Sequence, residues 1–183
     1  MPDRRAVFLD RDGVINRDSP DFIKTPEEMI LFPGVPQAIA RLDAAGFAVI
    51  VVSNQSGLAR GLVTLENLQA MHRKLNHAVE QAGGRLTGIY FCPHLPDAGC
   101  SCRKPKTGLL EQAAREHAIA LAQSYMAGDK PDDIACGRAA GCRTILILSG
   151  QTRRYDPDHF APHPDLICPD LPAAAEQILR DNG

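Results

Sequence analysis

Residues 6–16 read AVFLDRDGVIN, an apolar run that ends in two carboxylates and a glycine. A short apolar run bounded by charge is typical of a strand buried on both faces of a parallel sheet. Such a strand would carry Asp10 and Asp12 at its carboxyl end, which is the edge where ligands bind in open α/β sheets. The stretch therefore predicts a buried first strand with a candidate site at its end.

The segment Asp10–Gly13 has two other interpretations. It suits an ordinary turn, because Asp side chains bond nearby backbone groups and glycine accepts a positive φ. A calcium loop of the EF-hand type would need further oxygen ligands at alternate positions, whereas Val14 and Ile15 follow here. The calcium loop is excluded, and the plain turn stays open as an alternative to a functional site.

The rest of the chain alternates between apolar runs and segments with helical spacing of apolar residues. This alternation predicts a three-layer α/β sandwich around a central parallel Rossmann-like sheet, in a single domain over residues 1–183. Only a short insertion separates the second and third strands, so no large cap domain is expected over the site.

Residues 16–32 are expected to form a loop near the site. His72 and His77 are expected to be solvated on their helix, and Thr107 to cap the next one. The further strands are expected at about 47–52, 88–91, 124–127, 143–148 and 165–167, and the helices at about 35–45, 65–82, 107–117, 131–141 and from 172.

The charge balance argues against nucleic acid as a partner. The formal net charge is −2, and Lys and Arg are scattered rather than clustered. The apolar run before Asp10 is far too short for a signal sequence or a membrane span. We therefore expect a cytoplasmic monomer that acts on a small molecule and contacts neither nucleic acid nor membrane.

Polar side chains follow several of the predicted strands at the point where each strand ends. A parallel sheet brings such residues to one edge. Converging carboxylates suit Mg²⁺, and Lys, Arg, Ser and amide donors beside it suit a phosphoryl group. The chain has no Walker-type glycine-rich lysine loop, so a carboxylate nucleophile that forms an aspartyl-phosphate fits better than P-loop chemistry. The residues concerned are Asp10, Asp12, Ser53, Asn54, Asp129 and Lys130, with Arg103 and Lys104 from the preceding loop.

Three cysteines and a histidine lie close together in the loop at about 92–104. Cys92, His94, Cys100 and Cys102 are four soft ligands, which fit a closed tetrahedral and therefore structural Zn²⁺ site. Such an ion would stiffen the loop and place Arg103 and Lys104 over the phosphate. Buried thiols beside a surface histidine are the alternative. The remaining cysteines, Cys136, Cys142 and Cys168, are expected to be buried apolar residues.

The motifs FLDRDG at 8–13, SNQ at 53–55 and Gly-Asp at 128–129 resemble those of the haloacid dehalogenase-like phosphatases. The resemblance implies that Asp10 attacks phosphorus, while Asp12 protonates the leaving oxygen and later activates water. It implies that Mg²⁺ is held by Asp10, the Asp12 backbone carbonyl and Asp129. Ser53 and Lys104 would stabilise the phosphoryl oxygens, with Lys106 as the alternative to Lys104.

Within that superfamily, the Cys-Pro-His and Cys-x-Cys-Arg-Lys-Pro pattern resembles two related groups. These are the heptose-1,7-bisphosphate 7-phosphatases and the histidinol-phosphate phosphatases. Residues 53–61, SNQSGLARG, are similar to the heptose enzymes, whereas the histidinol type usually has an acidic residue where Ser56 stands. The resemblance implies removal of the 7-phosphate of D-glycero-D-manno-heptose 1,7-bisphosphate, on the route to nucleotide-activated heptose for lipopolysaccharide. A histidinol-phosphate phosphatase, a broad sugar-phosphate phosphatase and a phosphosugar-binding module without turnover remain alternatives.

The same resemblance implies a set of substrate contacts. Arg103 could pair with the second phosphate of a bisphosphate. The loop at 18–21 would touch the sugar, although its sequence also suits an ordinary solvated turn. The full set is Asp18, Ser19, Pro20, Asp21, Ser53, Asn54, Gln55, Ser56, Arg103, Lys104 and Lys130.

Overall fold

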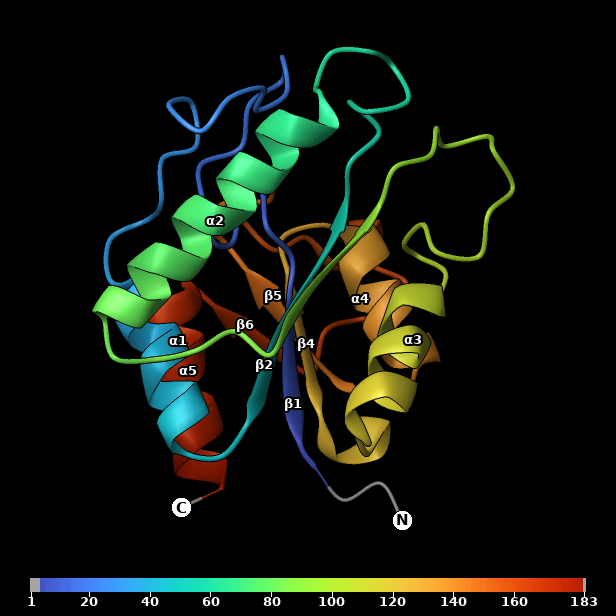
Figure 1. Cartoon of the computed structure of the whole chain (residues 1–183). Helices are drawn as coiled ribbons and strands as arrows, with labels where there is room; N and C mark the ends of the chain where they lie inside the picture. The colour runs from blue at the N-terminus through green and yellow to red at the C-terminus, as the bar shows by residue number, and fades with distance from the viewer. Residues whose placement is uncertain (1–3, 183) are drawn as a thin grey trace.

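The computed structural model describes residues 4–182, which form a parallel six-stranded sheet between two layers of helices (Figure 1). The strand order is β3-β2-β1-β4-β5-β6, and every neighbouring pair is parallel. The predicted α/β sandwich is confirmed. The strands are β1 Ala6–Leu9, β2 Ala48–Asn54, β3 Gly88–Cys92, β4 Tyr125–Gly128, β5 Arg143–Ile147 and β6 Leu166–Cys168.

The helices divide between the two faces of the sheet (Figure 1). One face is covered by α1 (Val35–Ala44), α2 (Leu65–Gln81) and α5 (Leu171–Asp181). The other is covered by α3 (Gly108–His117) and α4 (Pro131–Ala139). Short 3₁₀ turns occur at Leu121–Gln123 and Pro157–His159.

Strand β1 lies at the centre of the sheet, paired with β2 on one side and β4 on the other. All of its residues are fully buried. Val7 and Leu9 pack into the core beneath α1, α2 and α5, whereas Ala6 and Phe8 pack into the core beneath α3. The apolar run is therefore continuous because both faces of the strand are covered.

The ends of α1 and α2 carry residues of types that commonly occur there. Thr64 caps α2 by accepting a hydrogen bond from the Asn67 N–H at 3.1 Å. Gly46 follows α1 with a φ of 87°. Thr107 stands at the N-cap of α3 as expected, but its side chain does not cap the helix, because its hydroxyl donates to the Glu111 carboxylate at 2.6 Å instead of accepting from the backbone.

The expectation that His72 is solvated is also wrong. Its ring lies against Phe91 with the ring centroids 5.7 Å apart, and its Nε2 atom is buried. Burial, with the nearby Arg11 charge, lowers the pKa of His72 to about 4. His77, one turn further along α2, is exposed as expected.

Three loops stand above the carboxyl ends of the central strands, at the top of Figure 1. They follow β1, β2 and β3, and they cover residues 10–34, 55–64 and 93–107. The first is anchored to α2, because the Lys74 ammonium donates to the carbonyls of Pro26 and Met29 at 2.6 and 2.9 Å. No helix in the described part of the chain is long and apolar enough to cross a membrane.

Candidate active site

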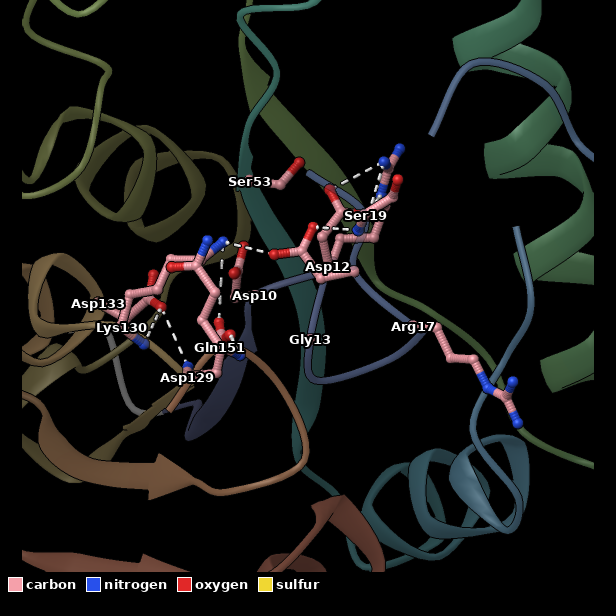
Figure 2. A network of polar contacts seen from close by, with 12 residues as sticks. Asp10, Asp12, Gly13, Arg17, Ser19, Ser53, Asp129, Lys130, Asp133 and Gln151 are labelled. Carbon is pink, nitrogen blue, oxygen red and sulfur yellow. Dashed lines mark hydrogen bonds and ion pairs between the residues drawn. The ribbon is translucent and has the colours of Figure 1, made fainter. Parts of the chain in front are cut away.

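Two buried carboxylates face one another at the carboxyl edge of the sheet (Figure 2). Asp10 follows β1 and Asp129 follows β4, and these strands are neighbours. Gly13 packs against the Asp129 carboxylate at a φ of 92°, where any side chain would collide with it. The glycine of the Asp-x-Asp-Gly segment thus makes a turn, and the turn lets the two acids approach.

The environment of Asp129 fits a bound cation. Burial raises the pKa of Asp129 to about 8, and the negative charge of Asp10 adds to the effect. Its Oδ2 atom accepts a hydrogen bond from the Gln151 N–H at 2.6 Å. Its Oδ1 atom is buried without a hydrogen-bond partner in residues 4–182, and the Lys130 ammonium lies 4.0 Å from it. A buried carboxylate oxygen without a partner beside a second carboxylate is a suitable hard-oxygen donor set for Mg²⁺.

Asp133 is a third carboxylate within 4.8 Å of this pair, and the sequence analysis missed it. Its Oδ2 atom accepts the backbone N–H groups of Asp129 and Lys130 at 3.2 and 3.1 Å. Its Oδ1 atom lies 2.6 Å from Lys104 Nζ. Both oxygens are engaged, so Asp133 caps α4 and orients Lys104. Its place four residues after Asp129, in the first turn of a helix, is the signal that could have found it.

Lys104 is the lysine that reaches Asp10. Its ammonium lies 2.8 Å from Asp10 Oδ1 and also donates to the Val52 carbonyl at 2.8 Å. Burial alone would lower the pKa of Lys104, but the charges of Asp10 and Asp133 outweigh burial and raise it. The exposed Lys106 instead donates to the carbonyls of Gly99 and Cys100.

Asn54 fixes the backbone that carries Lys104. Its side-chain amide donates to the Lys104 carbonyl and accepts from the Lys104 N–H, both at 3.1 Å. This pair of bonds ties the loop after β3 to the end of β2. Asn54 therefore lines the site and also holds the loop that enters it.

Asp12, labelled in Figure 2, is held by three neighbouring side chains. The Arg11 guanidinium donates to both its oxygens at 2.8 and 2.9 Å, and the amides of Asn16 and Gln55 donate at 2.9 and 3.0 Å. Burial alone would raise the pKa of Asp12, but the Arg11 charge and these hydrogen bonds lower it. The supporting roles of Arg11 and Asn16 were not predicted. Ser53, which is buried, lies 3.3 Å from the same Gln55 amide.

Two adjoining cavities open onto these groups. The nucleophile cavity, of about 150 Å³, is lined by Asp10, Asp12, Asn54, Arg103, Lys104, Lys130, Asp132 and Asp133. The acid cavity, of about 220 Å³, is lined by Asp12 but not by Asp10, and it also contacts Arg11, Asp18, Ser19, Pro20, Phe22, Ile23, Asn54, Gln55, Lys130 and Gln151.

Most of the predicted substrate contacts line these two cavities, but three do not. Asp18 lies 3.5 Å from the Lys130 ammonium, which ties the first loop to α4. Asp21 is exposed, and its N–H donates to the Ser19 hydroxyl. Ser56 is buried and lines neither cavity. The structure therefore brings Asp18, Ser19 and Pro20 to the site. It leaves Asp21, Ser53 and Ser56 outside both cavities, and Ser53 is buried.

The four predicted zinc ligands lie together in the loop after β3. The Nδ1 atom of His94 is 3.5 Å from the Cys92 sulfur and 3.3 Å from the Cys102 sulfur. The Cys92 and Cys100 sulfurs are 3.6 Å apart. All four ligand atoms lie within 4.8 Å of one another, a suitable donor set for Zn²⁺. The other cysteines, Cys136, Cys142 and Cys168, are buried as predicted.

Comparisons with known proteins agree with this geometry. Residues 101–174 match a family model described as HAD-hydrolase-like. The chain is 43% identical to the D-glycero-beta-D-manno-heptose-1,7-bisphosphate 7-phosphatase of Bordetella bronchiseptica, over 97% of this chain and 99% of that protein. It is 44% identical to the enzyme of the same name from Pseudomonas aeruginosa, with the same coverage. A crystal structure of the B. bronchiseptica D,D-heptose 1,7-bisphosphate phosphatase with magnesium and phosphate superposes with a TM-score of 0.88, at 42% identity over 97% of this chain and 99% of that one.

Proposed function

The chain belongs to the heptose-1,7-bisphosphate 7-phosphatase family of haloacid dehalogenase-like hydrolases, and we propose that it removes the 7-phosphate of D-glycero-D-manno-heptose 1,7-bisphosphate. It is a phosphoric monoester hydrolase, as the sequence predicted. The observation that carries the proposal is the buried Asp10 carboxylate, with the Lys104 ammonium on one side and the Asp129 carboxylate on the other. The histidinol-phosphate alternative is not favoured, because the relatives from B. bronchiseptica and P. aeruginosa, which match 97% of this chain, are heptose enzymes.

In the first step, a carboxylate oxygen of Asp10 attacks the 7-phosphorus, and the bond from phosphorus to the sugar oxygen breaks. Asp12, in its protonated form, donates a proton to the departing oxygen, which leaves an aspartyl-phosphate on Asp10. In the second step, Asp12 takes a proton from water, the water oxygen attacks phosphorus, and the Asp10 carboxylate is released with inorganic phosphate. The bonds from Arg11, Asn16 and Gln55 hold Asp12 in place for both proton transfers.

Asp10, the Asp12 backbone carbonyl and Asp129 are the groups that would hold Mg²⁺. When bound, the ion supplies positive charge at the phosphoryl oxygens and offsets the repulsion between phosphate and the carboxylates. The B. bronchiseptica relative was crystallised with magnesium and phosphate, which supports this assignment. The buried Oδ1 atom of Asp129, which accepts no hydrogen bond from residues 4–182, supports it independently.

Lys104 and Ser53 are the residues proposed to stabilise the transferred phosphoryl group. Lys104 is buried beside Asp10, so its charge acts in a site with little screening by water. The Ser53 hydroxyl comes from the end of the neighbouring strand β2. The proposal for Lys104 is supported by its 2.8 Å contact with the nucleophile, and the proposal for Ser53 by its place at the end of the strand next to β1.

We also propose that Cys92, His94, Cys100 and Cys102 hold a structural Zn²⁺. Four soft ligands leave no open position on a tetrahedral ion, so the ion takes no part in the reaction. The loop it closes carries Arg103 and Lys104, which line the nucleophile cavity. We place the enzyme in the cytoplasm, a reducing compartment where thiolates remain available to a metal.

Phosphate release from the bisphosphate tests the proposed function. Purified protein with Mg²⁺ is expected to release one phosphate per sugar, and Asp10→Asn is expected to be inactive because an amide is not a nucleophile here. Asp158→Asn, on an exposed 3₁₀ turn, is the matched control and should retain wild-type activity. Tight binding of the sugar phosphate without any release by the wild-type protein would instead support a binding module.

A further inference from the structure

Arg11, which holds the general acid Asp12, is the largest fully buried side chain in residues 4–182. Its Nε and Nη2 atoms donate to the Asp12 carboxylate. Because the guanidinium is planar, the remaining nitrogen, Nη1, points away from that carboxylate. Nη1 is also buried, and it has no hydrogen-bond partner among the described residues. A buried N–H group without a partner is costly, and more so when it is charged.

His72 on α2 carries a second buried atom of this kind. Its Nε2 atom has no hydrogen-bond partner within residues 4–182. Burial, with the charge of Arg11, lowers the pKa of His72 to about 4, so the ring is neutral at neutral pH. A neutral imidazole has one nitrogen that donates and one that accepts. With its proton on Nδ1, the ring offers Nε2 as an acceptor for an N–H group.

Helix α2 packs against the turn that carries Arg11. Met71, the neighbour of His72, lies in the same core as Ile15, whose N–H donates to the Arg11 carbonyl at 2.8 Å. The His72 ring itself lies against Phe91 at the carboxyl end of β3, with the ring centroids 5.7 Å apart. His72 therefore stands beneath the loops of the site, on the side of the sheet that α2 covers.

The ring is within electrostatic range of both members of the ion pair. The charge of Arg11 lowers the pKa of His72, and the charge of Asp12 raises it. Arg11 Nη1 and His72 Nε2 are not hydrogen-bonded to one another directly, since neither has a partner. A single water can join them, because it accepts from a guanidinium N–H and donates to a ring nitrogen. Buried waters typically link polar groups of this kind.

A contact at Nη1 would matter for the reaction because of what Arg11 holds. The bonds from Nε and Nη2 orient Asp12, and a general acid must be within hydrogen-bond reach of the oxygen that it protonates. Small displacements of such a group are costly to the rate. A guanidinium fixed at all three of its nitrogens keeps the Asp12 carboxylate in one place.

We propose that His72 is a positioning residue of the phosphatase reaction. Its ring accepts, through one buried water, the hydrogen bond of Arg11 Nη1, and it thereby fixes the guanidinium that orients Asp12. The inference rests on the proposed function, because it assumes that Asp12 protonates the oxygen of a departing sugar. It assigns to α2, which contributes no residue to either cavity, a part in the proton transfer.

The test compares kcat/KM for the heptose 1,7-bisphosphate with kcat/KM for p-nitrophenyl phosphate. The sugar oxygen needs a proton from Asp12, whereas nitrophenolate leaves without one. His72→Leu removes the accepting nitrogen and should lower the ratio of the first value to the second about 3- to 10-fold, the usual worth of one hydrogen bond. His72→Gln keeps an accepting oxygen and should retain most of the ratio. A loss of folded protein would lower both values together and leave the ratio unchanged.

Two further variants test the route of the effect. His77→Leu, on the same helix but exposed, should keep the wild-type ratio. Arg11→Lys, which lacks the guanidinium fork, should lower the ratio by itself. Adding His72→Leu to Arg11→Lys should then cause no further fall, because the two residues act through one contact. A crystal structure of the wild-type protein should show a water within hydrogen-bond distance of both Arg11 Nη1 and His72 Nε2.

Three results would overturn the positioning role. The first is a wild-type ratio in folded His72→Leu, and the second is an equal fall in His72→Gln. The third is an additive fall in the double variant, which would show that His72 does not act through Arg11. Failure of the proposed function would look different, because the wild-type protein would then release no phosphate from the bisphosphate.

Discussion

The Nζ atom of Lys104 lies 2.8 Å from Oδ1 of Asp10, with only 2% of the lysine exposed. The two residues are 94 positions apart in the sequence, and they meet because Asn54 ties the Lys104 backbone to the end of β2. A buried cation beside the nucleophile compensates its charge before substrate binds. It also leaves a positive group in place for the phosphoryl oxygens.

Lys104→Ala is therefore expected to lower kcat by about 10²- to 10³-fold, the usual cost of removing one electrostatic stabiliser of a transition state. Lys106→Ala is the matched control, because Lys106 is exposed and bonds only loop carbonyls. It should keep activity within about threefold. Steady-state kinetics of both variants would contradict the assignment if Lys106→Ala were the inactive one.

The Lys104 change should also destabilise the fold. Removing the lysine leaves Asp10 and Asp133 buried without their counter-charge, which typically costs about 3–5 kcal/mol. Urea unfolding of Lys104→Ala and Lys104→Met in the absence of Mg²⁺ would measure this. Adding Mg²⁺ should restore part of the loss, because the ion replaces the missing positive charge.

The proton-donor role of Asp12 predicts a dependence on the leaving group. Asp12→Asn should lower kcat/KM for the sugar phosphate by about 10²- to 10⁴-fold. For p-nitrophenyl phosphate the loss should be much smaller, because nitrophenolate leaves without a proton. The two substrates should be compared by kcat/KM, because this constant reports the steps up to formation of the aspartyl-phosphate and does not include its later hydrolysis. Equal losses for both substrates would show that Asp12 does not act as an acid.

The zinc proposal predicts one equivalent of Zn²⁺ per chain by elemental analysis. Cys102→Ser should lose the metal, whereas Cys168→Ala, a buried cysteine outside the cluster, should keep it. Since Arg103 and Lys104 follow Cys102 directly, the metal-free variant should also lose most of its activity. Full activity after chelation and return of Mg²⁺ alone, with no zinc in the protein, would refute the assignment.

His72 predicts a specific pH dependence of stability. Its pKa is about 4 in the fold and about 6.5 in the unfolded chain. Between these values the unfolded state binds more protons, so the free energy of unfolding falls as pH drops through this window. His72→Gln should remove this part of the acid sensitivity, on the order of 2 kcal/mol after allowing for partial exposure.

His77→Gln is the control for that experiment, because His77 is exposed on the same helix. Its unfolding free energy should follow the wild-type pH profile. An identical acid dependence in His72→Gln and the wild type would mean that His72 is not desolvated in solution.

The sheet was predictable because its strands are buried on both faces, which makes them continuous apolar runs in the sequence. The polar ends of β1, β2 and β4 could then be placed at one edge without knowing any side-chain position. Contacts that depend on side-chain reach could not be predicted in this way. Asp133 joins the site through an ion pair to a lysine 29 positions earlier, and Arg11 folds back onto its own neighbour Asp12.

The sequence-based expectations for His72 and Thr107 failed for a similar reason. His72 reads as a surface residue in the helical pattern of α2, but its ring packs against Phe91 of β3. Thr107 has the residue type of a helix cap, but a nearby glutamate takes its hydroxyl. In both cases a contact between two side chains determines the environment of the residue. The spacing of residue types along the sequence does not reveal such a contact.

The most direct test of the account is kcat/KM of the wild-type protein with Mg²⁺ for two substrates, D-glycero-D-manno-heptose 1,7-bisphosphate and histidinol phosphate. The similarity to heptose-1,7-bisphosphate phosphatases over nearly the full chain predicts at least about 100-fold preference for the bisphosphate, with release of the 7-phosphate alone. Equal or faster hydrolysis of histidinol phosphate would contradict the proposed function.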